Sequence, residues 1–235
     1  MDSIYTWPQN NLDFVFLVYG LAFVVMGVAI LTQPKKGSRF KLASILWFLA
    51  LFGLTHGTNE FLDMWAIIKG GSPVLDIVRW FMLVISYIFL FEFGRRIFYL
   101  NRPKRPYCWL SSLVVLLILI SGFTSSDFWK MGSIWARYLL GLPGGVLIAF
   151  GFYFHYKYHK KELKPLKVKK YFLLASASFL LYGILGGLIV PKANFFPASW
   201  LNTDSFLSVV HIPVEVFRAI CAIAAAIGIV PILRI

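Results

Sequence analysis

The chain of 235 residues is 59% hydrophobic and only 14% charged. A soluble domain carries about 25% charged residues, so this composition excludes an ordinary soluble domain and indicates a polytopic membrane protein. The formal net charge of +13 would suit a nucleic-acid binder. Its lysines and arginines, however, gather in alternate connections between apolar segments, and we therefore expect no nucleic-acid partner.

Seven apolar segments are long enough to cross a hydrocarbon core, which takes about 20 helical residues. In chain order they lie near residues 12–32, 42–68, 74–98, 107–123, 133–155, 171–190 and 206–230. The fourth segment is the weakest because its clean apolar part is short. The sequence therefore predicts an all-α protein, with residues 1–235 forming one domain built as a seven-transmembrane-helix bundle.

The basic residues predict the orientation of this bundle. They lie mainly in the first, third and fifth connections, near residues 35–41, 95–105 and 157–170, whereas the connections on the other side contain only Lys69, Lys130 and Lys192. Because Lys- and Arg-rich loops stay in the cytoplasm, we expect the N-terminus outside and the C-terminus in the cytoplasm.

The second segment contains the stretch LFGLTHGTNEFLDMW, in which an apolar helix carries polar side chains. His56, Asn59, Glu60 and Asp63 stand at positions i, i+3, i+4 and i+7, so on a helix they form one polar stripe. A charged side chain near the centre of a membrane helix costs roughly 2.5–3.5 kcal/mol on insertion scales. Such a stripe therefore indicates a structural or functional site.

Later segments add basic and acidic partners. The third segment contributes Arg79 and the fifth contributes Arg137. If the seventh segment is one continuous helix, His211, Glu215 and Arg218 repeat the spacing i, i+4 and i+7. At about 1.5 Å of rise per residue, both stripes fall in the outer half of the membrane.

Several interpretations of these nine residues remain open. They form a buried ion-pair network that only fixes helix packing, or they line a polar pocket that opens to the outer face and binds a small ligand. His56 also titrates near neutral pH, which allows proton sensing.

A metal or a haem is a further alternative, because His56 with Glu60 and His211 with Glu215 are two histidine–glutamate pairs at i, i+4. A membrane-embedded zinc hydrolase is another, although the sequence shows no convincing nucleophile set. Within this chain we expect no catalytic output domain and therefore no enzyme.

Several stretches together resemble a known bacterial module. They are LWFLALFGLTHGTNEFLDMW, FEFGRR, ARYLLGLPGG and PASWLNTDSFLSVVHIPVEVFRAICAIAAA. The chain is similar to the N-terminal multi-span sensor region of sensor histidine kinases and related signalling proteins. The motif positions that carry over are His56, Glu60, Asp63, Arg137 and Arg218.

This resemblance implies a signal-input module in the bacterial inner (plasma) membrane, whose last helix conveys a change to the cytoplasm. It also implies a homodimer and a cytoplasmic kinase or other output domain, in cis or in trans. It does not identify the ligand.

Overall fold

The computed structural model describes residues 2–33, 41–100, 102 and 109–233. The helices are α1 (Asp2–Asn10), α2 (Leu12–Thr32), a 3-10 turn (Lys41–Ser44), α3 (Leu46–Lys69), α4 (Pro73–Tyr99), α5 (Leu110–Phe123), α6 (Phe128–Ala136), a π-helical segment η2 (Arg137–Gly141), α7 (Leu142–Tyr158), α8 (Lys160–Leu163), α9 (Lys169–Gly187), α10 (Thr203–Val210) and α11 (Val214–Ile232). The expected all-α class is confirmed.

By length and composition, five helical runs are able to cross a membrane: α2, α4, the continuous run Phe128–Tyr158, α9 and α11. The chain is therefore a multi-pass membrane protein. Helix α3 has 24 residues but carries the polar stripe, and α5 has only 14 residues. Most of the basic connection near 35–41, part of the one near 95–105 and the start of the expected fourth segment lie outside the described residues.

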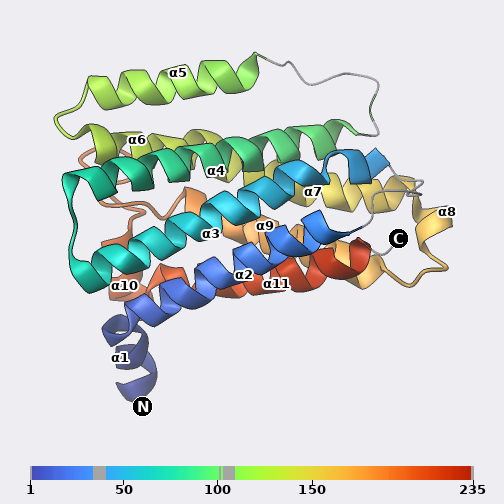
Figure 1. Ribbon diagram of the computed structural model, residues 1–235, viewed down its shortest axis with the longest axis horizontal. Helices are drawn as coiled ribbons and strands as arrows, with labels where there is room; N and C mark the ends of the chain where they lie inside the picture. The colour runs from blue at the N-terminus through green and yellow to red at the C-terminus, as the bar shows by residue number, and fades with distance from the viewer. Residues whose placement is uncertain (1, 34–40, 101, 103–108, 234–235) are drawn as a thin grey trace.

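Six long helices form a closed ring. Helix α2 packs on α3, α3 on α4, α4 on α7, α7 on α9, α9 on α11, and α11 returns to α2. Helix α5 lies along the outside of this ring, where it contacts α6 and α4 (Figure 1). One end of the bundle carries α1 and α10 and the other carries α8, and we call these the α10 end and the α8 end (Figure 1).

Glycines bring the ring helices into close contact. A Cβ atom on Gly57 of α3 would lie 2.6 Å from the backbone oxygen of Gly20 on α2. In the same way, a Cβ atom on Gly145 of α7 would lie 2.6 Å from the Cα atom of Gly183 on α9. Small residues allow membrane helices to approach at backbone distance, so these positions set the diameter of the ring.

The helical run from α6 to α7 contains a π-helical turn just before Pro143. Proline has no N–H to donate, and its ring clashes with the carbonyl four residues earlier, here that of Leu139. A π turn widens the helix locally and lets the run continue past such a residue. Arg137 is the first residue of this widened turn.

The expected continuous helix over 206–230 is wrong. Helix α10 ends at Val210, His211 adopts a left-handed conformation with φ of 62°, and α11 begins only at Val214. The cause is Pro213, which lacks a backbone donor and disfavours helical geometry in the residue before it. His211 is therefore not on one face with Glu215 and Arg218.

Replacement of Gly57 by alanine tests the close contact between α2 and α3. The added methyl group meets backbone rather than a flexible side chain, so we expect Gly57→Ala to lower the thermal unfolding temperature, with a cost of about 1–3 kcal/mol. Gly71→Ala is the matched control, because nothing lies within 4 Å of its added Cβ. Equal unfolding temperatures for both variants in detergent would contradict this packing.

Candidate functional site

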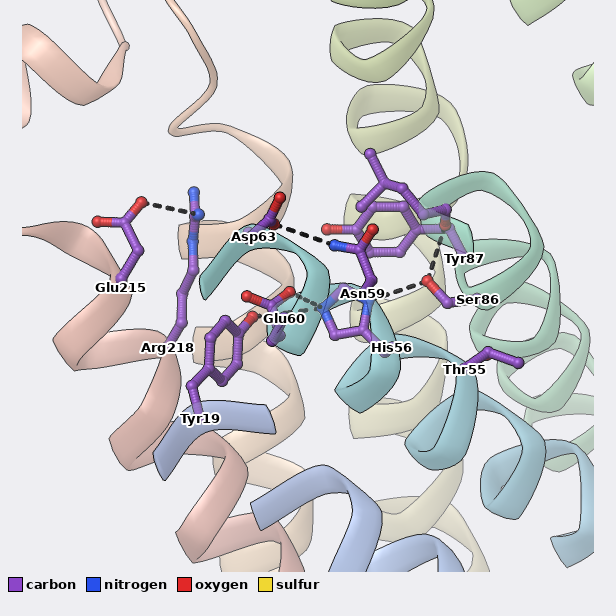
Figure 2. Close-up of polar contacts among 12 residues, drawn as sticks. Tyr19, Thr55, His56, Asn59, Glu60, Asp63, Ser86, Tyr87, Glu215 and Arg218 are labelled. Carbon is purple, nitrogen blue, oxygen red and sulfur yellow. Dashed lines mark hydrogen bonds and ion pairs between the residues drawn. The ribbon is translucent and has the colours of Figure 1, made fainter. Parts of the chain in front are cut away.

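Polar side chains from all six ring helices converge between them. Figure 2 shows several of these side chains pointing toward one another from different helices. We call this group the polar centre, and it consists of Tyr19 (α2), His56 and Glu60 (α3), Ser86 and Tyr87 (α4), Arg137 (η2, which runs into α7), Tyr182 (α9) and Arg218 (α11).

His56 lies at the middle of the polar centre and is 1% exposed. Its Nδ1 atom is 2.9 Å from the Ser86 hydroxyl oxygen, and that hydroxyl donates its proton to the Leu83 carbonyl at 2.7 Å. Because the Ser86 proton is already used, Nδ1 must be the donor to Ser86. The neutral ring then has its acceptor at Nε2.

The Nε2 atom of His56 has two near partners, and the Tyr19 hydroxyl lies farther away at 3.4 Å. The Tyr182 hydroxyl lies 2.6 Å away and Glu60 Oε1 lies 3.2 Å away. A neutral His56 accepts a hydrogen bond from the Tyr182 hydroxyl at Nε2, whereas a protonated one pairs with the Glu60 carboxylate. Tyr19 extends this chain, because its hydroxyl donates to the Tyr182 oxygen at 3.3 Å. Proton sensing at His56 stays a prediction.

Aromatic rings enclose this histidine. The Phe23 and Phe52 ring centroids lie 5.2 and 5.1 Å from that of His56, and Tyr87 lies at 5.3 Å. The imidazole therefore has little contact with water, and its hydrogen bonds operate at a low local dielectric. Removal of one partner leaves the other buried and unsatisfied, which is costly.

Two arginines hold the carboxyl-terminal end of α9. Arg218 of α11 donates to the Leu185 carbonyl at 3.0 and 3.2 Å and to the Ile189 carbonyl at 2.6 Å. Arg137 donates to the Gly186 carbonyl at 3.2 Å and to the Tyr87 hydroxyl at 3.3 Å. The last carbonyls of a helix lack partners within it and carry partial negative charge, so guanidinium groups are suited to this position.

Arg218 also pairs with Glu215, with 3.4 Å between Nη1 and Oε1. Figure 2 shows these two side chains reaching toward one another from α11. His211, in contrast, is an exposed residue at the end of α10, and its carbonyl accepts a hydrogen bond from the Gln9 amide at 2.9 Å.

A second group of charges lies nearer the α10 end. Arg79 contacts Asp63 through Nε and Nη2, both at 2.5 Å, and contacts Asp76 through Nη1 at 3.1 Å. The Asn59 amide donates to Asp63 at 3.2 Å. The stripe predicted on α3 thus divides: His56 and Glu60 join the polar centre, while Asn59 and Asp63 face this second group.

A cavity of about 350 Å³ opens beside this group. It is lined by Asn59, Asp63, Asp76, Arg79, Trp80, Leu83, Asp127, Trp129, Lys130, Ser133, Arg137 and Pro191. We call it the α10-end cavity. Arg137 belongs both to its lining and to the polar centre, so the cavity and the centre share one guanidinium group.

Three buried polar atoms of cavity-lining residues have no hydrogen-bond partner within the described part of the chain. They are Asn59 Oδ1, an acceptor on a side chain that is 2% exposed, and two donors, Trp80 Nε1 and Arg137 Nε. In Figure 2 the Asn59 amide oxygen points away from His56. A network that served packing alone would be expected to satisfy such atoms.

The described residues contain no group of three or more His, Cys, Asp and Glu side chains that could hold a metal ion. His56 is buried in the ring, whereas His211 is exposed and precedes the first residue of α11. The two histidine–glutamate pairs of the alternative metal or haem interpretation are therefore not brought together.

Comparison of the chain with protein-family models, with curated proteins and with solved structures found no match.

The tyrosines and Ser86 of the polar centre are not among the site residues predicted from the sequence. The three tyrosines, Tyr19, Tyr87 and Tyr182, each lie in an apolar segment. A tyrosine in such a segment is usually a packing residue. The one indication was their position along the apolar segments. Tyrosines in membrane helices favour the membrane interfaces, whereas these three lie inside the bundle.

Replacement of Tyr182 by phenylalanine tests the polar centre. The variant keeps the ring but removes the hydroxyl nearest His56 Nε2, so this buried acceptor loses its nearest partner and keeps only the Tyr19 hydroxyl at 3.4 Å as a hydroxyl donor. We expect a loss of about 1–3 kcal/mol in the free energy of unfolding. Tyr153→Phe is the matched control, since Tyr153 lies on α7 and is 44% exposed. Thermal unfolding in the same detergent measures both, and equal stability of the two variants would count against the described hydrogen bond.

Proposed function

We propose that this chain is the transmembrane signal-input module of a bacterial sensor. A small ligand binds in the α10-end cavity, and the resulting change passes through the polar centre to α11. The observation that carries this proposal is the double role of Arg137, which lines the cavity and also donates to the end of α9 that Arg218 of α11 holds.

The proposed topology keeps seven crossings, with the α10 end outside and the α8 end in the cytoplasm. Helix α3 counts as a crossing because it is 24 residues long and packs in the ring between α2 and α4. Helix α5, with 14 residues, spans about 21 Å at 1.5 Å per residue. It therefore needs flanking residues or local bilayer thinning to complete its crossing.

The proposed transmission begins at Arg137. A ligand group that attracts this guanidinium competes with the Gly186 carbonyl and the Tyr87 hydroxyl for its donors. The end of α9 then loses one of its two arginine partners, and the remaining bonds to Arg218 readjust. Because Arg218 belongs to α11, the readjustment moves or rotates α11 relative to the ring.

The incomplete hydrogen bonding of the buried polar side chains favours this function over a purely structural role. Buried polar groups that only fix packing are generally all hydrogen-bonded, whereas Asn59 Oδ1 and Arg137 Nε are not within the described residues. Coupling between two sites in one protein typically amounts to about 1–3 kcal/mol, or 5–150-fold in affinity. Loss of one or two buried hydrogen bonds is of this size.

The resemblance of the sequence to sensor regions of histidine kinases supports the same proposal. It adds the expectation of a homodimer and of a kinase or other output domain, in cis or in trans. In such an assembly, the cytoplasmic end of α11 conveys the change.

A chimeric kinase tests the proposal. Helix α11 is joined to the cytoplasmic core of a histidine kinase at a series of junctions one residue apart, and autophosphorylation is measured in lipid nanodiscs. We expect Glu60→Gln and Arg218→Lys to change the output about 5–150-fold. Glu60→Gln alters the buried pair with His56 at the middle of the polar centre, and Arg218→Lys alters the contact between α11 and α9.

Asp204→Asn is the control for these variants, since Asp204 is exposed on α10. The proposal fails if Glu60→Gln and Arg218→Lys leave both thermal stability and kinase output unchanged at every junction.

A further inference from the structure

The α10-end cavity has two walls of opposite character. One wall belongs to α6 and η2, where Lys130, Ser133 and Arg137 follow one another at i, i+3 and i+7 and so share a helix face. The other wall belongs to α3 and α4 and carries Asn59 and Asp63.

The first wall has a net positive charge, because Lys130 and Arg137 outnumber Asp127 at the N-cap of α6. Within the described residues no carboxylate lies within 4 Å of the Arg137 guanidinium or the Lys130 ammonium group, and Arg137 Nε has no hydrogen-bond partner. Ser133 adds a hydroxyl between them, although it already donates to the Lys130 carbonyl at 2.8 Å. A guanidinium group with donors to spare is suited to a carboxylate, which it binds through two parallel hydrogen bonds.

The second wall is acidic. Asp63 and Asp76 together surround the single positive charge of Arg79, which leaves an excess of one negative charge. Beside them, the buried Asn59 presents its unpartnered Oδ1 atom, which accepts hydrogen bonds only. This wall is therefore suited to a ligand group that carries N–H donors and a positive charge.

Over the whole lining, three acidic residues, Asp63, Asp76 and Asp127, balance Arg79, Lys130 and Arg137. A ligand with a net charge would disturb this balance inside a bundle of low dielectric. A ligand with one positive and one negative end, in contrast, matches both walls and leaves the balance unchanged.

The size and the remaining lining limit the ligand further. About 350 Å³ is near the lower end of small-molecule sites, which measure roughly 300–1,000 Å³. Trp80, Leu83 and Trp129 supply apolar surface.

We propose that the α10-end cavity binds a small zwitterion of the amino-acid type. Its carboxylate lies against Arg137 and Lys130, and its ammonium group lies against Asn59 Oδ1 and Asp63. This inference rests on the proposed receptor function and names the chemical class of the ligand.

Ligand binding is measured on the full chain in lipid nanodiscs by thermal shift and calorimetry. The probes are the α-amino acids with neutral side chains, each at millimolar concentration. For each amino acid that binds, the matching 2-hydroxy acid and the matching primary amine are measured as well. We expect an amino acid to bind at least about tenfold more tightly than either analogue, a difference of about 1.4 kcal/mol.

Two substitutions locate the binding. Lys130→Gln changes an exposed residue of the basic wall, and Asn59→Ala removes the unpartnered acceptor. Both are expected to weaken binding by about tenfold or more. Lys69→Gln is the matched control for Lys130→Gln, because Lys69 is another exposed lysine at the same end of the bundle but does not line the cavity.

Four results would overturn this inference. Equal binding of the hydroxy acid would indicate a simple anion site, and equal binding of the amine would indicate a cation site. Binding that is unchanged in both Lys130→Gln and Asn59→Ala would place the ligand elsewhere. Absence of binding by every amino acid would exclude the ligand class, while a changed kinase output in the chimera would still support the signal-input function.

Discussion

The carboxyl-terminal end of α9 lies inside the bundle, and its last carbonyl groups need donors there. Water satisfies such groups in a soluble protein, but a membrane protein must supply partners from within. Here Arg218 reaches Leu185 and Ile189 from α11, and Arg137 reaches Gly186 from η2. These bonds tie α9 to both sides of the ring, and the other polar contacts are arranged around them.

The contacts at the end of α9 also require the ring helices to pack closely. Glycines such as Gly57 and Gly145 allow the helices to approach closely enough for side chains from all six to meet. The π turn carries the α6–α7 run past Pro143, and Arg137 stands at its start. A local irregularity thus coincides with the residue that links the cavity to the polar centre, as π turns often do at functional sites.

Much of this architecture is visible in the sequence, because long apolar runs predict helices by length alone. The apolar segment at 12–32 matches α2, and that at 74–98 differs from α4 by one residue at each end. The seventh segment shows the limit of that reasoning. Its hydrophobicity continues through 206–230, but Pro213 interrupts the backbone and places His211 outside α11.

The polar centre is likewise only partly predictable from the sequence. Charged residues in apolar helices stand out, so Glu60, Arg137 and Arg218 were found from the sequence. Tyrosine is common in membrane helices, and the participation of Tyr19 and Tyr182 depends on how the ring closes, which a linear pattern does not contain. The cavity is likewise a product of packing between α3, α4 and α6.

The proposed transmission from the cavity to α11 depends most on the shared attachment of Arg137 and Arg218 to the end of α9. A double-mutant cycle with Arg137→Gln and Arg218→Gln, measured as the free energy of unfolding in detergent, tests this attachment directly. We predict a coupling energy of at least about 0.5 kcal/mol, because residues in one hydrogen-bond network interact by about 0.5–3 kcal/mol. Effects that add to within about 0.3 kcal/mol, as for independent sites, would contradict the account.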